Sequence, residues 1–216
     1  MTHDHSSLPA GCWERGFDLS YRLACEQLAK IGDIEEQCRR SGARYLGPHE
    51  IVINYLNQLY HILLPDGKIL SEDSDRETRL WDKILILHYL TGAKGTSATG
   101  KLIAFKQLSG GVSYFPAFSQ RVIGPLVKNF GRGPELLRKA AAKLGGCEAD
   151  YGDLSVTINA FDQVPITLVL WKGDEEVAPN GNILFDANIS DYLSTEDVTV
   201  LSETIVWKLV KNIPSA

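Results

Sequence analysis

An aromatic segment that follows two glycines is the best candidate for a ligand-binding surface in this sequence. It reads GGVSYFPAF from Gly110 to Phe118, and Arg121 follows it. Paired glycines let a backbone approach a ligand closely, aromatic rings offer flat contact area, and a guanidinium pairs with anions. We interpret Tyr114, Phe115, Phe118 and Arg121 as one binding loop. A loop that only fills the core is the alternative.

The segment GTSATGK at residues 95–101 matches the GxxxxGK pattern of a phosphate-binding loop. In such a loop the residue after the lysine is Ser or Thr and holds magnesium, whereas Leu102 stands there in this chain. The motif also normally follows a strand and begins a helix, but the pattern here indicates a helix before it and a strand after it. We therefore expect a flexible helix-to-strand connection that binds neither ATP nor GTP.

The histidine at position 88 lies in an apolar helical stretch, four residues after Ile84 and seven after Trp81. A histidine in such surroundings needs a hydrogen-bond partner or a coordinated atom, because burial of an unpaired polar group is costly. Two interpretations stay open. His88 is either a core histidine with a hydrogen-bond partner or an axial ligand to the metal of a cofactor.

Acidic residues gather after a β-rich run that ends at Trp171. Asp174, Glu175 and Glu176 follow this run, and Asp186 follows the next one. Neighbouring carboxylates can perform acid–base chemistry or bind a divalent metal, while an exposed turn has the same composition. No GxSxG, HExxH or kinase-type motif accompanies them. The sequence therefore assigns no catalytic residue.

Composition excludes several classes of protein. Of the 216 residues, 44% are hydrophobic and 23% are charged, which is enough apolar surface for one core. The net charge of −5, without a basic stripe, argues against nucleic-acid binding. No apolar run reaches the roughly 18 residues of a membrane span, and residues 1–13 lack the apolar region of a secretory signal. Four cysteines without a CxxC pair predict neither zinc nor iron–sulfur ligation, so we expect a cytoplasmic protein with free thiols.

Hydrophobic periodicity indicates the elements that must position these candidate residues. Residues 1–12 are expected to form a flexible tail and residues 13–216 a single domain. Strands come in groups separated by groups of helices, which predicts an α+β fold with a largely antiparallel sheet and packed helices. The expected helices span residues 14–40, 74–91, 119–130, 134–144 and 195–211, and the expected strands 50–56, 59–64, 68–70, 102–105, 154–161, 166–171 and 182–185. The second helix is apolar nearly all round, so we expect it to be packed on both sides.

Seven blocks follow one another along the chain: ILILHYL at 84–90, FKQLSGG at 105–111, YFPAF at 114–118, PITLVLW at 165–171, DEE at 174–176, ILFD at 183–186 and YL at 192–193. In these blocks the chain resembles an uncharacterised single-domain family of anaerobic bacteria and archaea, from about residue 15 to 212. Val177 stands where that family usually has an aromatic residue. Some members resemble fusions to a small iron–sulfur domain like that of corrinoid iron–sulfur proteins. The resemblance thus implies a connection with corrinoid or one-carbon metabolism, in a version without the clustered cysteines.

We therefore hypothesise a non-catalytic binding protein for a large, flat cofactor, with a corrinoid such as cobalamin as the leading ligand. The expected site is the aromatic segment with Arg121, reached by Trp171 and, if its helix faces the pocket, by His88. Two alternatives stay open. One is a metal-dependent enzyme that uses Asp174 and Glu175, and the other is a module that docks a partner protein through the aromatic segment.

Overall fold

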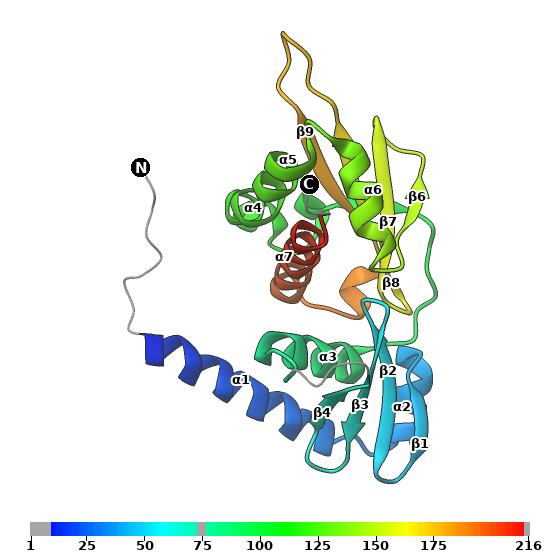
Figure 1. Ribbon diagram of the computed structural model, residues 1–216. Coiled ribbons are helices and arrows are strands. Elements are labelled where there is room, and N and C mark those ends of the chain that lie inside the picture. Colours follow the sequence, from blue (N-terminus) through cyan, green and yellow to red (C-terminus); the bar gives the residue numbers. More distant parts are fainter. Residues whose placement is uncertain (1–9, 73–76, 214–216) are drawn as a thin grey trace.

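The N-terminal half of the chain forms a four-stranded antiparallel sheet with three helices beside it, in the lower half of Figure 1. The computed structural model describes residues 10–72 and 77–213. Residues 1–9 of the expected tail lie outside the described residues, and residues 10–12 belong to the first helix. The elements of this half are α1 (Ala10–Ala29), α2 (Ile34–Ser41), β1 (Arg44–Gly47), β2 (Glu50–Tyr55), β3 (Gln58–Leu63), β4 (Lys68–Ser71) and α3 (Leu80–Gly92), with the strands in sequential order.

The second half forms a five-stranded antiparallel sheet with the order β5-β9-β8-β7-β6, packed against four helices in the upper half of Figure 1. Its strands are β5 (Leu102–Ala104), β6 (Cys147–Ala149), β7 (Leu154–Phe161), β8 (Val164–Trp171) and β9 (Asn180–Asp186). Its helices are α4 (Gly111–Phe118), α5 (Gly124–Phe130), α6 (Pro134–Ala142) and α7 (Thr195–Lys211), with the short turns η1 (Phe105–Gln107), η2 (Ser119–Ile123, a π-helix) and η3 (Ile189–Asp191). The α+β prediction is confirmed.

One core joins the two sheets. Leu56, in the hairpin between β2 and β3, is buried, and its backbone N–H donates to the carbonyl of Ala160 in β7 over 2.9 Å. Tyr89 of α3 stacks on Phe161 of β7 with ring centroids 3.9 Å apart. Because buried side chains of both halves belong to one apolar cluster, the molecule is a single domain.

Helix α3 lies at the centre of the molecule, as its all-round apolar pattern predicts. It contacts α1 on one side and α7 on another. Its apolar body is buried, including Leu85, Ile86 and Tyr89. Only Trp81, near the first turn, is exposed among its large hydrophobic residues. The expectation of packing on both sides is therefore confirmed.

The aromatic segment is a helix and not the expected loop. Gly110 has a positive φ of 70° and caps α4, which spans Gly111–Phe118 with Pro116 inside it. A Cβ at position 111 would lie 2.1 Å from the carbonyl oxygen of Phe105, so close packing requires that glycine. The expectation of a loop was wrong because glycine and proline, usually signs of a turn, here begin and interrupt a helix that continues as η2 and α5.

The predicted and observed strands also differ in two smaller respects. The edge strands β1 and β6 were not predicted, because each is short and mostly exposed and so shows no apolar alternation. Pro165, expected as a break, lies inside β8 opposite Asn159, beside an irregularity in the β7–β8 register. Proline is tolerated at such irregularities, where a ladder hydrogen bond is already missing.

Candidate functional site

The aromatic side chains of the expected binding site lie partly in the core and partly on the surface. Phe118 is fully buried and stacks on Phe105 with ring centroids 3.9 Å apart, so its assignment to a binding surface is wrong. Phe115 is half-buried, and the ammonium group of Lys106 lies 4.0 Å from its ring centroid. Tyr114 is 51% exposed. Helical geometry is the reason, since these neighbours point in different directions around α4.

The structure brings Phe115 and Trp171 together, as the sequence suggested. Both line a cavity of about 460 Å³ between α4, η2 and the ends of β8 and β9. Asn180 and Asn182 of β9 complete that surface with Lys106. Arg121 and His88 do not line it, so the six expected site residues do not form one site.

Arg121 instead lines a different groove, which lies between α3 and α7. Its guanidinium forms an ion pair with Glu203 of α7. The groove has a volume of about 480 Å³, and we call it the tryptophan groove because two indoles line it. Trp81 is 37% exposed and Trp207 is 46% exposed. The complete lining is Arg79, Trp81, Arg121, Val200, Glu203, Thr204, Trp207 and Lys211.

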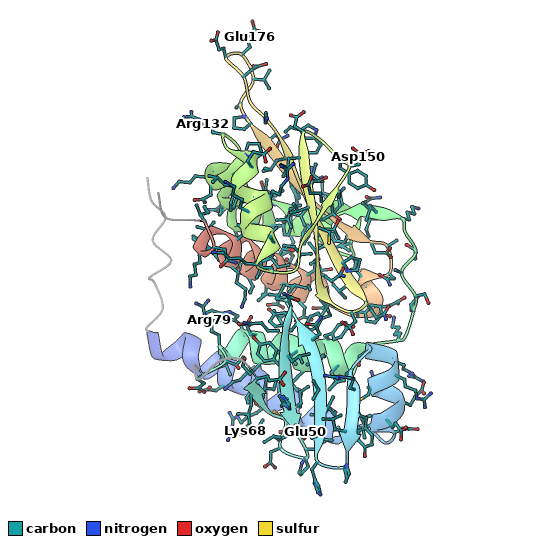
Figure 2. The ribbon with its side chains drawn as sticks, turned by 45° about the vertical axis from the view of Figure 1, so that its right-hand side comes forward. Glu50, Lys68, Arg79, Arg132, Asp150 and Glu176 are labelled. Atoms are coloured by element: carbon teal, nitrogen blue, oxygen red, sulfur yellow. The ribbon has the colours of Figure 1, made fainter. Side chains whose placement is uncertain are left out.

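The tryptophan groove combines apolar faces with positive charge. The guanidinium of Arg79 lies 5.5 Å from the ring centroid of Trp81. The lining holds three cationic side chains and one carboxylate. The cations are Arg79, Arg121 and Lys211, and the carboxylate is that of Glu203. Indole faces bind planar groups, and an excess of cationic side chains favours a ligand with negative charge. In Figure 2 Arg79 lies where the two halves of the molecule meet.

His88 lies beside this groove in a smaller cavity of about 170 Å³, which shares Trp81 and Val200 with it. The imidazole Nδ1 is 2.8 Å from Oδ1 of Asp197. The hydroxyl of Ser194 donates to the other carboxylate oxygen over 2.6 Å. Ser194 and Asp197 form a reciprocal capping box at the start of α7, so the helix end itself fixes the carboxylate that orients His88.

Electrostatics in this pair favour the charged state of both partners. The hydrogen bond with Asp197 raises the pKa of His88 above its ordinary value. Burial opposes ionisation of Asp197, but the hydrogen bonds from His88 and Ser194 outweigh it and hold the pKa of that carboxyl below its ordinary value. With Nδ1–H directed at Asp197, Nε2 is the nitrogen left for an external partner. His88 is therefore hydrogen-bonded, as the first of its two interpretations requires, and a third of its side chain is exposed.

The GxxxxGK segment has an internal partner in place of a phosphate. The backbone N–H groups of Thr99 and Gly100 donate to the carboxylate of Asp186 over 3.0 and 2.8 Å, and the Thr99 hydroxyl donates over 2.8 Å. Asp186 is buried, and these bonds with that of Asn188 lower the pKa of its carboxyl against the opposing effect of burial. The segment connects α3 to β5, so the expected helix-to-strand connection is confirmed.

The acidic cluster lies at the tip of the hairpin between β8 and β9, where Figure 2 labels Glu176, and none of its residues lines either cavity described above. Asp174 accepts hydrogen bonds from the N–H groups of Glu176 and Val177 over 2.9 and 2.7 Å. These bonds lower the pKa of the Asp174 carboxyl. The cluster is thus an exposed turn that the hydrogen bonds to the Asp174 side chain stabilise. Within residues 10–72 and 77–213, no group of three His, Cys, Asp or Glu side chains is arranged to hold a metal ion.

The residues that the sequence reasoning missed form a stripe on α7. Val200, Glu203, Trp207 and Lys211 follow one another at intervals of three, four and four residues, which places them on one helical face. A tryptophan between an acidic and a basic residue on such a face is a signal for a partly exposed aromatic site. Trp81 was instead assigned to the apolar body of its helix, although the charged residues Asp82 and Lys83 follow it directly.

Fold and site together define an α+β protein of two antiparallel sheets with a ligand-sized groove between its central and its C-terminal helix. The family model described as a domain of unknown function (DUF3786) matches residues 33–208, and the chain belongs to that family. No curated protein and no solved structure matches the chain. Across the described ranges, no helix has the length and apolar character to cross a membrane.

Proposed function

We propose that this is a non-catalytic binding protein that holds a planar cofactor in the tryptophan groove. The observation that carries the proposal is the pair of partly exposed indoles, Trp81 and Trp207, in one cavity of about 480 Å³. Ligand pockets of roughly 300–1,000 Å³ are usual for organic ligands, and they combine apolar lining with few polar groups. Arg79 and Arg121 would pair with negative groups at the ligand's edge.

A corrinoid is the cofactor that we propose to test first. The resemblance to proteins fused to iron–sulfur domains of the corrinoid type, from anaerobes, points to this class, and we propose a cytoplasmic location from the sparse, unclustered cysteines. One axial donor is available beside the groove: His88 is oriented through Nδ1 by Asp197, the arrangement that metal-ligating histidines commonly have. Nε2 of His88 would coordinate the metal, while Trp81 would contact the macrocycle. A bound corrinoid would supply cobalt-centred one-carbon chemistry.

The test is a titration with hydroxocobalamin, followed by the corrin absorption bands and by tryptophan fluorescence. We expect Trp207→Ala to weaken binding by more than about tenfold, because a fully desolvated aromatic side chain contributes roughly 1.5–3 kcal/mol. The matched control is Trp171→Ala, which removes an equally exposed indole from the cavity that Phe115 lines.

The two variants separate the possible outcomes. Loss of binding in Trp171→Ala but not in Trp207→Ala would show that the ligand binds in the cavity that Phe115 lines, and it would refute binding in the tryptophan groove. No spectral change with wild-type protein, and no colour retained after desalting, would refute corrinoid binding. His88→Ala should remove the spectral signature of nitrogen coordination while leaving the contribution of the indoles in place.

A further inference from the structure

A second cavity, of about 390 Å³, adjoins the tryptophan groove and is polar where the groove is apolar. The two share Arg79, Trp207 and Lys211. From there the second cavity extends between β3, β4, the start of α3 and the end of α7. We call it the polar cavity, and its other lining residues are Leu56, Gln58, Tyr60, Ser71, Glu77, Thr78, Asp82, Lys143, Leu144, Lys208 and Asn212.

Two hydroxyl groups of the polar cavity lack partners. The Ser71 Oγ and Thr78 Oγ1 atoms are buried and have no hydrogen-bond partner in the described part of the chain. A buried hydroxyl without a partner costs free energy, so such groups in a cavity are expected to serve a ligand or ordered water. Both atoms have almost no accessible surface, so each would donate to an anionic oxygen after its side chain rotates toward the cavity that its residue lines.

Positive charge dominates the same cavity. Arg79, Lys143, Lys208 and Lys211 line it, against the carboxylates of Glu77 and Asp82. Glu77 is paired over 3.0 Å with Lys83, a residue that does not line the cavity. The excess therefore favours an anion, as long as Asp82 does not oppose it.

The carboxyl group of Asp82 is engaged within the protein. It is 3% exposed and accepts a hydrogen bond of 2.8 Å from the hydroxyl of Tyr55. Burial raises its pKa, and the charges of Lys208 and Arg79 oppose that rise. Asp82 is therefore a like charge that a bound anion meets in this cavity, and the charges of Lys208 and Arg79 offset part of its repulsion.

We propose that the polar cavity binds a phosphate group, with Lys208 and Lys211 as charge partners and the hydroxyls of Ser71 and Thr78 as donors. Lysine, arginine and Ser/Thr hydroxyls are the side chains that contact phosphate oxygens in proteins. The inference stands on the polar cavity and does not rest on the proposed function. A planar cofactor that carries a phosphate would occupy both cavities through the shared residues Arg79 and Lys211.

The experiment is calorimetric titration of the whole chain with inorganic pyrophosphate at constant ionic strength. The double variant Lys208→Gln/Lys211→Gln should bind at least about tenfold more weakly, because two unit charges close to the anion are removed. The control Lys139→Gln/Lys172→Gln makes the same charge change at exposed positions outside the cavity and should stay within about twofold of wild type. Equal losses in both variants, or no binding to wild type, would overturn the proposal.

Two single substitutions test the individual groups. Asp82→Asn removes a like charge and should tighten pyrophosphate binding by about threefold, a direction that general destabilisation would not produce. Thr78→Val should weaken binding without lowering the free energy of unfolding of the unliganded protein, because its hydroxyl has no partner among residues 10–72 and 77–213. Unchanged affinity in Thr78→Val would refute its role as a donor.

Succinate in place of pyrophosphate distinguishes a phosphate site from a carboxylate site, and tighter binding of succinate would overturn the phosphate assignment. Pyrophosphate has no planar part. Failure of corrinoid binding therefore leaves the pyrophosphate result intact, and failure of pyrophosphate binding leaves the tryptophan groove untouched.

Discussion

His88 on α3 and Asp197 on α7 are joined by a hydrogen bond of 2.8 Å, although 109 positions separate them in the sequence. The bond ties together the two helices that line the tryptophan groove. Ser194 holds the second carboxylate oxygen at the start of α7. One charged pair thus connects the central helix, the C-terminal helix and the candidate cofactor site.

The free energy of unfolding should depend on pH through this pair. Because the pKa of His88 is raised in the folded protein, its contribution is present below the ordinary value of 6.5 and is lost as the pH rises through the raised value. Because the pKa of Asp197 is lowered, its contribution is present above the ordinary value of 3.8 and is lost as the pH falls through the lowered value. Asp197→Asn should therefore destabilise the protein more at about pH 5.5 than at about pH 9.

Urea unfolding at both pH values checks this expectation. The control is Asp18→Asn, which makes the same change at an exposed position on α1. An equal loss of stability at the two pH values would show that Asp197 acts only as part of the helix cap. NMR titration of His88 in the Asp197→Asn variant should show a lower pKa than in wild type.

Phe118→Ala should destabilise the protein by about 3–5 kcal/mol, because it removes a fully buried ring that stacks on Phe105. Phe115→Ala is the matched substitution one helical turn earlier. It removes a half-buried ring and should cost less than about half as much. Denaturant unfolding of both variants measures the difference. Similar losses for the two would contradict the assignment of Phe118 to the core and Phe115 to the surface.

Tyr55→Phe should lower the free energy of unfolding by about 1–3 kcal/mol. The substitution keeps the ring and removes the hydroxyl that donates to Asp82, so the carboxyl group stays buried with one partner fewer. Tyr60→Phe is the control, since its hydroxyl donates to Gln58 in a part-buried position. Thermal and urea unfolding should rank Tyr55→Phe as the more destabilised variant, and the reverse order would refute the importance of the Tyr55–Asp82 bond.

Magnesium ATP should not bind through the GxxxxGK segment. The N–H groups of Thr99 and Gly100, which a phosphate would need, already donate to Asp186. Leu102 also offers no oxygen to magnesium. Calorimetry with wild type and Lys101→Ala tests this. Magnesium-dependent binding in the micromolar range that Lys101→Ala abolishes would show that Asp186 can be displaced.

Local sequence patterns were sufficient for most of the elements. Helix α7 begins after its Ser194 cap and ends at Lys211, because capping chemistry and a regular apolar stripe act over a few residues. The buried character of α3 followed from its composition alone. The same local rules misassigned α4, since Gly110 and Pro116 are compatible with a helix only when neighbouring segments pack against it.

The site depended on contacts that no local pattern encodes. Trp81 and Trp207 share a cavity because α3 and α7 pack side by side, although the sequence separates them by more than half the chain. Packing of η2 against α7 brings Arg121 to Glu203, and packing of α3 against α7 supplies Asp197 to His88. Residue types and their spacing predict which side chains lie on one face of a helix or strand. Which helices and strands pack together depends on the burial of apolar faces that are far apart in the sequence.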